Sequence, residues 1–202
     1  MITGVVDYKA GNLKSIENAL KNLNANFIIS DDPGKLKDCD KLIFPGVGEA
    51  SSAMRTLSKY GLDQFLKEYA KKGNPMLGIC LGTQIILTCS EEGSAECLNI
   101  IEGKVKLFDK NMGLKIPQIG WNTMRYAKPH YLFKDIPDNS SFYFVHSYYP
   151  DVKKEFAIGE CEYGITFACA ISLDNICAVQ FHPEKSGRHG LKLMENFLKG
   201  NS

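Results

Sequence analysis

The sequence predicts an α/β fold in which a mostly parallel central sheet is flanked by helices and extended by antiparallel strands, within a single domain spanning residues 1–202. Three observations support this class. Short apolar runs alternate with segments of helical periodicity in the first half, closely spaced strand-like runs fill the second half, and 202 residues suffice for one substantial core. No repeat or low-complexity tract interrupts the pattern.

The first half of the chain has the pattern of successive βα units. Runs rich in Val, Ile and Phe predict buried strands, and apolar residues spaced three and four apart predict helices. The expected strands are 2–7, 26–30, 41–45 and 75–79, and the expected helices are 12–23, 51–58, 62–72 and 82–89. Such alternation is typical of parallel strands joined by helical connections.

From about residue 100 the pattern changes to strands with short connections. Hairpins are expected to add antiparallel strands here, and a final helix carries one apolar stripe. The expected strands are 100–108, 115–119, 141–145, 156–161, 166–172 and 176–181, and the expected helix is 190–198. The expected loops are 90–99 and 122–140, the second of which contains Pro129 and Pro137.

Charge and hydropathy narrow the range of partners. Lys and Arg number 24 against 23 Asp and Glu, for a net charge of +1, and no basic block stands out. Nucleic acid and anionic membrane surfaces therefore gain no electrostatic support as partners. The first residues lack the basic and apolar regions of a signal peptide, and no run approaches the roughly 18 apolar residues of a transmembrane helix. A cytoplasmic location is expected.

The cysteine pattern predicts neither a disulfide framework nor a metal site. The seven cysteines are spread along the chain without a CxxC pair or zinc-type spacing. Six of them are interpreted as small buried hydrophobes. These six are Cys39, Cys89, Cys97, Cys161, Cys169 and Cys177.

Cys80 differs from the other six because glycines lie two residues before and after it. An apolar strand precedes the segment Gly78-Ile-Cys-Leu-Gly82, and a helix follows it. A tight strand-to-helix turn requires small residues at these two positions and leaves the central side chain free, as in the nucleophile elbow of hydrolases. The helix N-terminus favours a thiolate, and the backbone N–H of Leu81 is free to bind an oxyanion. The alternative is a structural cysteine in an ordinary βα turn.

His182 is the preferred base for this thiol. It ends a strand-like run, and Pro183 favours extended backbone before it, which predicts that His182 and Glu184 lie on one side of the chain. A carboxylate there would orient the imidazole and complete a catalytic triad. His146 is the second candidate, because it lacks a nearby carboxylate. The remaining histidines, His130 and His189, are expected at the surface.

A glycine-containing loop, Pro45-Gly-Val-Gly48, follows the predicted strand 41–45. Glycines allow backbone amides to approach a ligand closely. The N–H of Val47 or Gly48 is therefore a candidate oxyanion donor opposite that of Leu81, as acyl transfer requires. The alternative is a simple turn into the next helix.

Together these motifs make the chain similar to the class I, or triad-type, glutamine amidotransferases, and most closely to the glutaminase subunits of imidazole glycerol phosphate synthase. The segments GICLG and FHPE are shared across the class, whereas DYKAGN, IGWN and YFVHSY single out the subfamily. The matching segments are 7–15, 45–48, 78–84, 90–92, 115–122, 142–148 and 180–186.

The resemblance implies a class I glutamine amidotransferase-like fold and hydrolysis of L-glutamine through a thioester at Cys80, without cofactor or metal. It also implies contacts to glutamine from Gly48, Gln84, Glu92, Ser147 and Tyr148. The implied partner is a separate (βα)8-barrel cyclase subunit in a heterodimer of histidine biosynthesis. The positions that match the partner interface are Asn12, Trp121, Asn122 and Tyr143.

Three departures from the family pattern leave the ammonia acceptor open. Thr83 stands where Met is usual, Gln118 replaces the His common before IGWN, and 93–101 lacks a glycine-rich run. A paralogous glutaminase that supplies a sugar-modifying synthetase of surface-glycan biosynthesis is therefore an alternative. Two further alternatives are a stand-alone cysteine hydrolase of γ-glutamyl or peptide substrates, and a binding module without catalysis.

Overall fold

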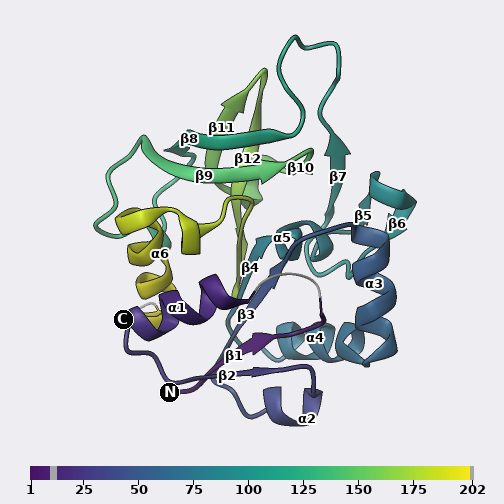
Figure 1. Cartoon of the computed structure of the whole chain (residues 1–202), viewed down its shortest axis with the longest axis vertical. Helices are drawn as coiled ribbons and strands as arrows, with labels where there is room; N and C mark the ends of the chain where they lie inside the picture. The colour runs from purple at the N-terminus through teal and green to yellow at the C-terminus, as the bar shows by residue number, and fades with distance from the viewer. Residues whose placement is uncertain (10–12, 201–202) are drawn as a thin grey trace.

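The structure is a computed structural model that describes residues 1–9 and 13–200. Its centre is a nine-stranded sheet in the order β2-β1-β3-β4-β13-β12-β11-β8-β9 (Figure 1). Neighbouring strands are parallel from β2 through β13 and antiparallel from β13 to β9. These strands are β1 (Thr3–Val6), β2 (Phe27–Ser30), β3 (Lys41–Gly46), β4 (Met76–Cys80), β8 (Gln118–Tyr126), β9 (Ser140–His146), β11 (Ala157–Tyr163), β12 (Ile165–Leu173) and β13 (Ile176–Val179).

A smaller sheet and six α-helices complete the described part of the chain. The smaller sheet has the order β10-β7-β5-β6. Its strands are β5 (Cys89–Ser90), β6 (Ala95–Glu96), β7 (Gly103–Leu107) and β10 (Tyr148–Val152). The helices are α1 (Lys14–Asn22), α2 (Pro33–Leu36), α3 (Ala50–Lys59), α4 (Leu62–Lys71), α5 (Leu81–Ile85) and α6 (Gly187–Lys199).

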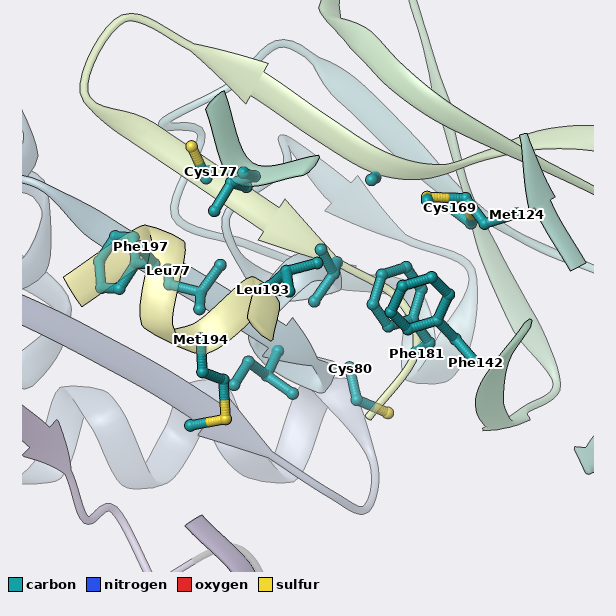
Figure 2. Close-up of a cluster of buried hydrophobic side chains, with 14 of the residues drawn as sticks. Leu77, Cys80, Met124, Phe142, Cys169, Cys177, Phe181, Leu193, Met194 and Phe197 are labelled. Atoms are coloured by element: carbon teal, nitrogen blue, oxygen red, sulfur yellow. The ribbon is translucent and has the colours of Figure 1, made fainter. Parts of the chain in front are cut away.

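Side chains on the two faces of the central sheet form two hydrophobic clusters. Because neighbouring residues of a strand point to opposite faces, Val5 of β1 joins the cluster that contains α1 and α6, and Val6 joins the one that contains α3, α4 and α5. Figure 2 shows the first cluster, with side chains of α6 beside Leu77 and the overlapping rings of Phe142 and Phe181 near Cys80. The nucleophile candidate therefore sits at the edge of a packed core.

The predicted α/β class is confirmed, and most predicted strands and helices fall within a few residues of the observed ones. The predicted helix 82–89 is too long, because α5 ends at Ile85 and the chain turns into β5. The predicted loop 90–99 contains β6 and a short 3-10 turn, Glu92–Ser94. Pairing between β5 and β6 is what orders this segment, and two-residue strands leave no periodicity to find.

The region after residue 110 differs most from the prediction. The strand expected at 115–119 begins only at Gln118, but continues as β8 to Tyr126, through the first part of the predicted loop 122–140. Exposed residues of β8 alternate with buried or half-buried ones, and the strand is held by pairing to β9 and β11, which a local pattern cannot reveal. The sequence also failed to predict β10 and α2.

Five of the six cysteines that were interpreted as buried hydrophobes are buried, whereas Cys89 is half-buried. In the described ranges no group of three His, Cys, Asp or Glu side chains is placed to hold a metal ion. Over the same ranges no helix combines the length and apolar character needed to cross a membrane.

Candidate active site

Cys80 occupies a strained turn between the central strand β4 and α5. Its backbone has φ 54° and ψ −109°, a conformation that non-glycine residues rarely adopt. The two glycines around it are required by close packing. A Cβ on Gly82 would lie 1.9 Å from the carbonyl oxygen of Phe44, and one on Gly78 would lie 3.0 Å from Cβ of Ala178. The strain at Cys80 is thus maintained by packing on both sides.

The loop that follows β3 faces the same turn. A Cβ on Gly46 would lie 1.9 Å from the hydroxyl oxygen of Tyr8, which is itself buried and finds no hydrogen-bond partner among the residues that the structure describes. Gly48 adopts φ 102°, which favours glycine, and a Cβ there would meet nothing within 4 Å. A side chain at position 46 would therefore clash with Tyr8, whereas glycine at position 48 is favoured by the positive φ of the backbone there. Val47 between them is 43% exposed.

His182 and Glu184 form a buried ion pair beside this turn. His182 Nδ1 lies 2.7 Å from Glu184 Oε1, and the two side chains are only 3% and 5% exposed. His182 has extended backbone, as predicted, but Pro183–Lys185 forms a 3-10 turn. The turn, and not the period of an extended strand, brings the two side chains together.

Strand β9 anchors this pair from the other side. The N–H of His182 donates to the carbonyl of Tyr143, and the N–H of Tyr143 donates to the hydroxyl of Ser186. Nε2 of His182 is buried and has no hydrogen-bond partner within the described ranges. Because Glu184 occupies Nδ1, Nε2 is the ring atom left to exchange a proton with the thiol.

The charge balance around His182 favours its protonated form. Burial lowers the pKa of His182, but the interactions with Cys80 and Glu184 outweigh burial and raise it to about 10. Proton transfer from the thiol to this imidazole therefore produces a thiolate–imidazolium pair.

His146 lies in the same site, although it was ranked second as a base. Burial lowers its pKa to about 4, so the ring is neutral at physiological pH. Its Nδ1 lies 2.7 Å from the carbonyl oxygen of Tyr148, which can only accept, so Nδ1 carries the proton. Among the described residues no carboxylate pairs with His146, so it lacks the charge stabilisation that His182 receives. The remaining histidines, His130 and His189, lie outside this cavity and are partly exposed, so each reaches the surface with part of its side chain buried.

A cavity of about 300 Å³ brings the predicted groups together. Each of the five predicted glutamine contacts lines it, as do Cys80 and His182 of the predicted triad and the predicted oxyanion residues Val47 and Leu81. The lining residues are Val47, Gly48, Cys80, Leu81, Gln84, Glu92, Pro117, Val145, His146, Ser147, Tyr148 and His182. A larger cavity at α4 and the start of β13 contains none of this chemistry.

Two predicted glutamine contacts already have partners in the protein. A carboxylate oxygen of Glu92 accepts a hydrogen bond from the N–H of Ala50 at 2.8 Å, and burial raises the pKa of Glu92. The amide nitrogen of Gln84 donates to the carbonyl of Tyr148 and to the side chain of Gln180, both at 3.0 Å. Gln180 was not predicted as a site residue, although its position two residues before His182 is a signal that could have found it.

The predicted partner-facing residues lie on β8 and β9. Trp121 is 59% exposed, and its ring contacts Tyr143, its cross-strand neighbour, at a centroid separation of 6.2 Å. Ile119, two residues before Trp121, is 64% exposed. Asn122 is half-buried and donates to the carbonyl of Glu162. Asn12 lies outside the described residues.

Comparisons with known proteins agree with the geometry. The family model described as "Glutamine amidotransferase class-I" matches residues 4–200. Curated relatives named imidazole glycerol phosphate synthase subunit HisH include one from Methanosarcina mazei, 44% identical with 96% of each chain covered, and one from Maridesulfovibrio salexigens, 43% identical with 96% and 95% covered. A third, named subunit HisH 1, from Campylobacter jejuni, is 44% identical with 96% and 98% covered.

Solved structures show the same fold at lower identity. One, described as a glutamine amidotransferase, has a TM-score of 0.75 at 18% identity and covers 98% of each chain. PurLQS from Thermotoga maritima has a TM-score of 0.72 at 17% identity, with 98% of this chain and 97% of that chain covered.

Proposed function

The chain belongs to the class I glutamine amidotransferases, and we propose that within this family it is the glutaminase subunit of an imidazole glycerol phosphate synthase, which hydrolyses L-glutamine to glutamate and ammonia. The observation that carries the reaction is Cys80 at a strained elbow, lining one cavity with a histidine whose Nδ1 is held by Glu184. The assignment to the synthase is supported by full-length relatives of that name at 43–44% identity.

In the first half of the proposed reaction, the sulfur of Cys80 attacks the side-chain carbonyl carbon of glutamine. The thiol proton passes to Nε2 of His182, and Glu184 stabilises the imidazolium. The N–H groups of Leu81 and of Val47 or Gly48 bind the oxyanion of the tetrahedral intermediate. Collapse of this intermediate breaks the C–N bond, His182 returns the proton to the leaving nitrogen, and ammonia departs from a γ-glutamyl thioester.

In the second half, water attacks the thioester carbonyl carbon. His182 accepts a proton from the water and returns it to the sulfur as the C–S bond breaks. Glutamate and the free thiol result, so the net reaction consumes one water for each glutamine. The substrate is held by five residues, Gly48, Gln84, Glu92, Ser147 and Tyr148. The side-chain oxygen of Gln84 is able to accept a hydrogen bond from the amino group of glutamine.

The proposed partner is a separate (βα)8-barrel cyclase subunit that consumes the ammonia. The exposed apolar residues Ile119 and Trp121, together with Tyr143, provide the surface that it would cover. Large exposed aromatic residues are typical anchors of protein interfaces. Asn12 and Asn122 are proposed to flank this surface.

The function is tested by incubating the purified chain with glutamine, alone and with a barrel-type cyclase subunit of imidazole glycerol phosphate synthase. Glutamate release that rises with the partner supports the proposal. Release that needs a sugar-modifying synthetase instead would support the surface-glycan alternative, and cleavage of γ-glutamyl conjugates or peptides without partner would support a stand-alone hydrolase. Absence of glutamate release under every condition would refute a glutaminase.

The pH dependence of hydrolysis provides a second test of the triad. Since the raised pKa of His182 keeps the imidazole protonated below about pH 10, activity should fall as pH rises through that value, where the acid for ammonia release is lost. Glu184→Gln removes a charge that raises this pKa, so the alkaline limb should move to lower pH, and kcat should fall roughly 1,000-fold. An unchanged alkaline limb in the folded variant would contradict the role of Glu184.

A further inference from the structure

Gln180 contacts the sulfur of Cys80 from a fully buried position. It follows β13, is 0% exposed, and its amide nitrogen Nε2 lies 3.8 Å from Cys80 Sγ, within reach of a hydrogen bond to sulfur. The amide oxygen Oε1 accepts from Gln84 Nε2 at 3.0 Å. The buried amide of Gln180 thus contacts the sulfur of Cys80 through its nitrogen and Gln84 of helix α5 through its oxygen.

The orientation of both amides is fixed by a backbone carbonyl. The carbonyl of Tyr148 can only accept, so the end of Gln84 that faces it must be the nitrogen. The second hydrogen of that nitrogen goes to Gln180 Oε1. If Gln180 were turned over, two nitrogen donors would face each other. The network therefore forces Gln180 to present N–H groups to the sulfur.

The carbonyl of Val145, a second neighbour of the sulfur, has the opposite polarity to the Gln180 amide. Cys80 Sγ lies 4.0 Å from the carbonyl oxygen of Val145, to which a thiol can donate but which repels a thiolate. A donor such as the Gln180 amide favours the thiolate instead, because a hydrogen bond to the charged form stabilises that form. The two neighbours thus discriminate between the two protonation states.

We propose that Gln180 is a catalytic residue that stabilises the Cys80 thiolate by donating an amide hydrogen to the sulfur, and that Gln84 positions this amide. The inference deepens the proposed glutaminase function and rests on it for its role in turnover. It assigns Gln84 two tasks, because its amide nitrogen orients Gln180 and the residue also lines the substrate cavity.

The test is the pH dependence of Cys80 alkylation by iodoacetamide, measured on the full chain without partner by mass spectrometry of the Cys80 peptide. Gln180→Met keeps the side-chain length but removes the donor. The midpoint of the alkylation profile should move up by about one pH unit, so that alkylation below the midpoint slows about 10-fold. With the partner present, kcat for glutamine should fall about 10-fold while KM stays within about twofold.

Thr83→Val provides the matched control. Thr83 is fully buried on α5, and its hydroxyl donates to the carbonyl of Val179, next to Gln180, at 2.6 Å. This variant should lower Tm by about 2–6 °C without moving the alkylation midpoint. A midpoint shift equal to that of Gln180→Met would overturn the proposal, because loss of local packing would then explain both.

Gln84→Met provides a second route if Gln180→Met does not fold. It should raise the alkylation midpoint by a smaller amount, so that alkylation below the midpoint slows about threefold. The effect is smaller because Gln180 is still present, although its side-chain amide can now rotate. An unmoved midpoint in whichever of these variants folds overturns the inference. Wild-type glutamine turnover distinguishes the two proposals. If the wild-type protein does not hydrolyse glutamine but the variants still shift the alkylation midpoint, only the glutaminase function is refuted. If the wild-type protein is active but the variants leave the midpoint unmoved, only the role of Gln180 is refuted.

Discussion

Cys80→Ala should abolish glutamine hydrolysis, with a loss of about a million-fold in kcat, and leave the protein folded. The loss is large because the sulfur forms the thioester bond in the first half of the proposed reaction and is the leaving group in the second, and members of a triad act as a unit. The side chain is buried at the edge of a hydrophobic cluster and one atom is removed, so stability should change by about 1 kcal/mol or less. Glutamate release with partner and thermal unfolding measure the two effects.

Cys177→Ala is the control for loss of a buried thiol. Cys177 lies on β13 in the same hydrophobic cluster, 1% exposed, and its sulfur contacts Tyr131 and Ser172, outside the cavity. Its replacement should cost about as much stability as Cys80→Ala or more, with kcat unchanged. If Cys80→Ala retained a tenth of wild-type activity, the sulfur could not be the nucleophile.

Gly82→Ala should destabilise the protein by about 3 kcal/mol and sharply reduce turnover. The new Cβ would lie 1.9 Å from the backbone oxygen of Phe44 and 3.0 Å from its carbonyl carbon. Both atoms belong to the central strand β3, so relief requires moving β3 or α5, which carries the turn at Cys80. In an ordinary helix, Gly→Ala would instead be stabilising.

Gly34→Ala is the matched control for this substitution. Gly34 also lies in a short helix, α2, but its Cβ would meet only the movable carboxylate of Asp32, at 3.0 Å. Stability there should change by about 0.5 kcal/mol or less. Urea denaturation measures the free energy of unfolding of both variants. Equal values would mean that the contact between position 82 and the backbone of Phe44 does not constrain the turn at Cys80.

The parts of the fold that were predicted from sequence are those whose pattern is local. Val- and Ile-rich runs bounded by helices gave β1, β3 and β4 close to their observed bounds, because buried parallel strands require continuous apolar sequence. Strand β8 could not be found in this way. Only Met124 is fully buried among its residues 122–126, because the exposed Thr123 and Arg125 alternate with partly buried ones, and pairing with β9 and β11 makes the segment a strand.

The same distinction between local sequence patterns and long-range contacts applies to the candidate site. Cys80, His182 and Glu184 stand in short motifs whose glycines and proline have a direct geometric meaning, so the sequence alone could group them. Gln180 could not be assigned a role from the sequence, because that role depends on contacts between residues about 100 positions apart, to Cys80 and to Gln84. The side-by-side placement of His146 and His182 in the cavity likewise needed the structure.

The central claim is that Cys80 forms a γ-glutamyl thioester during glutamine hydrolysis. This step is tested by quenching the chain with acid during turnover, in the presence of the proposed cyclase partner, and mapping the bound glutamyl group by peptide mass spectrometry. We expect a glutamyl group on the Cys80 peptide, absent without glutamine and absent in Cys80→Ala. An acyl group on another residue, or glutamate release that continues in Cys80→Ala at the wild-type rate, would contradict it.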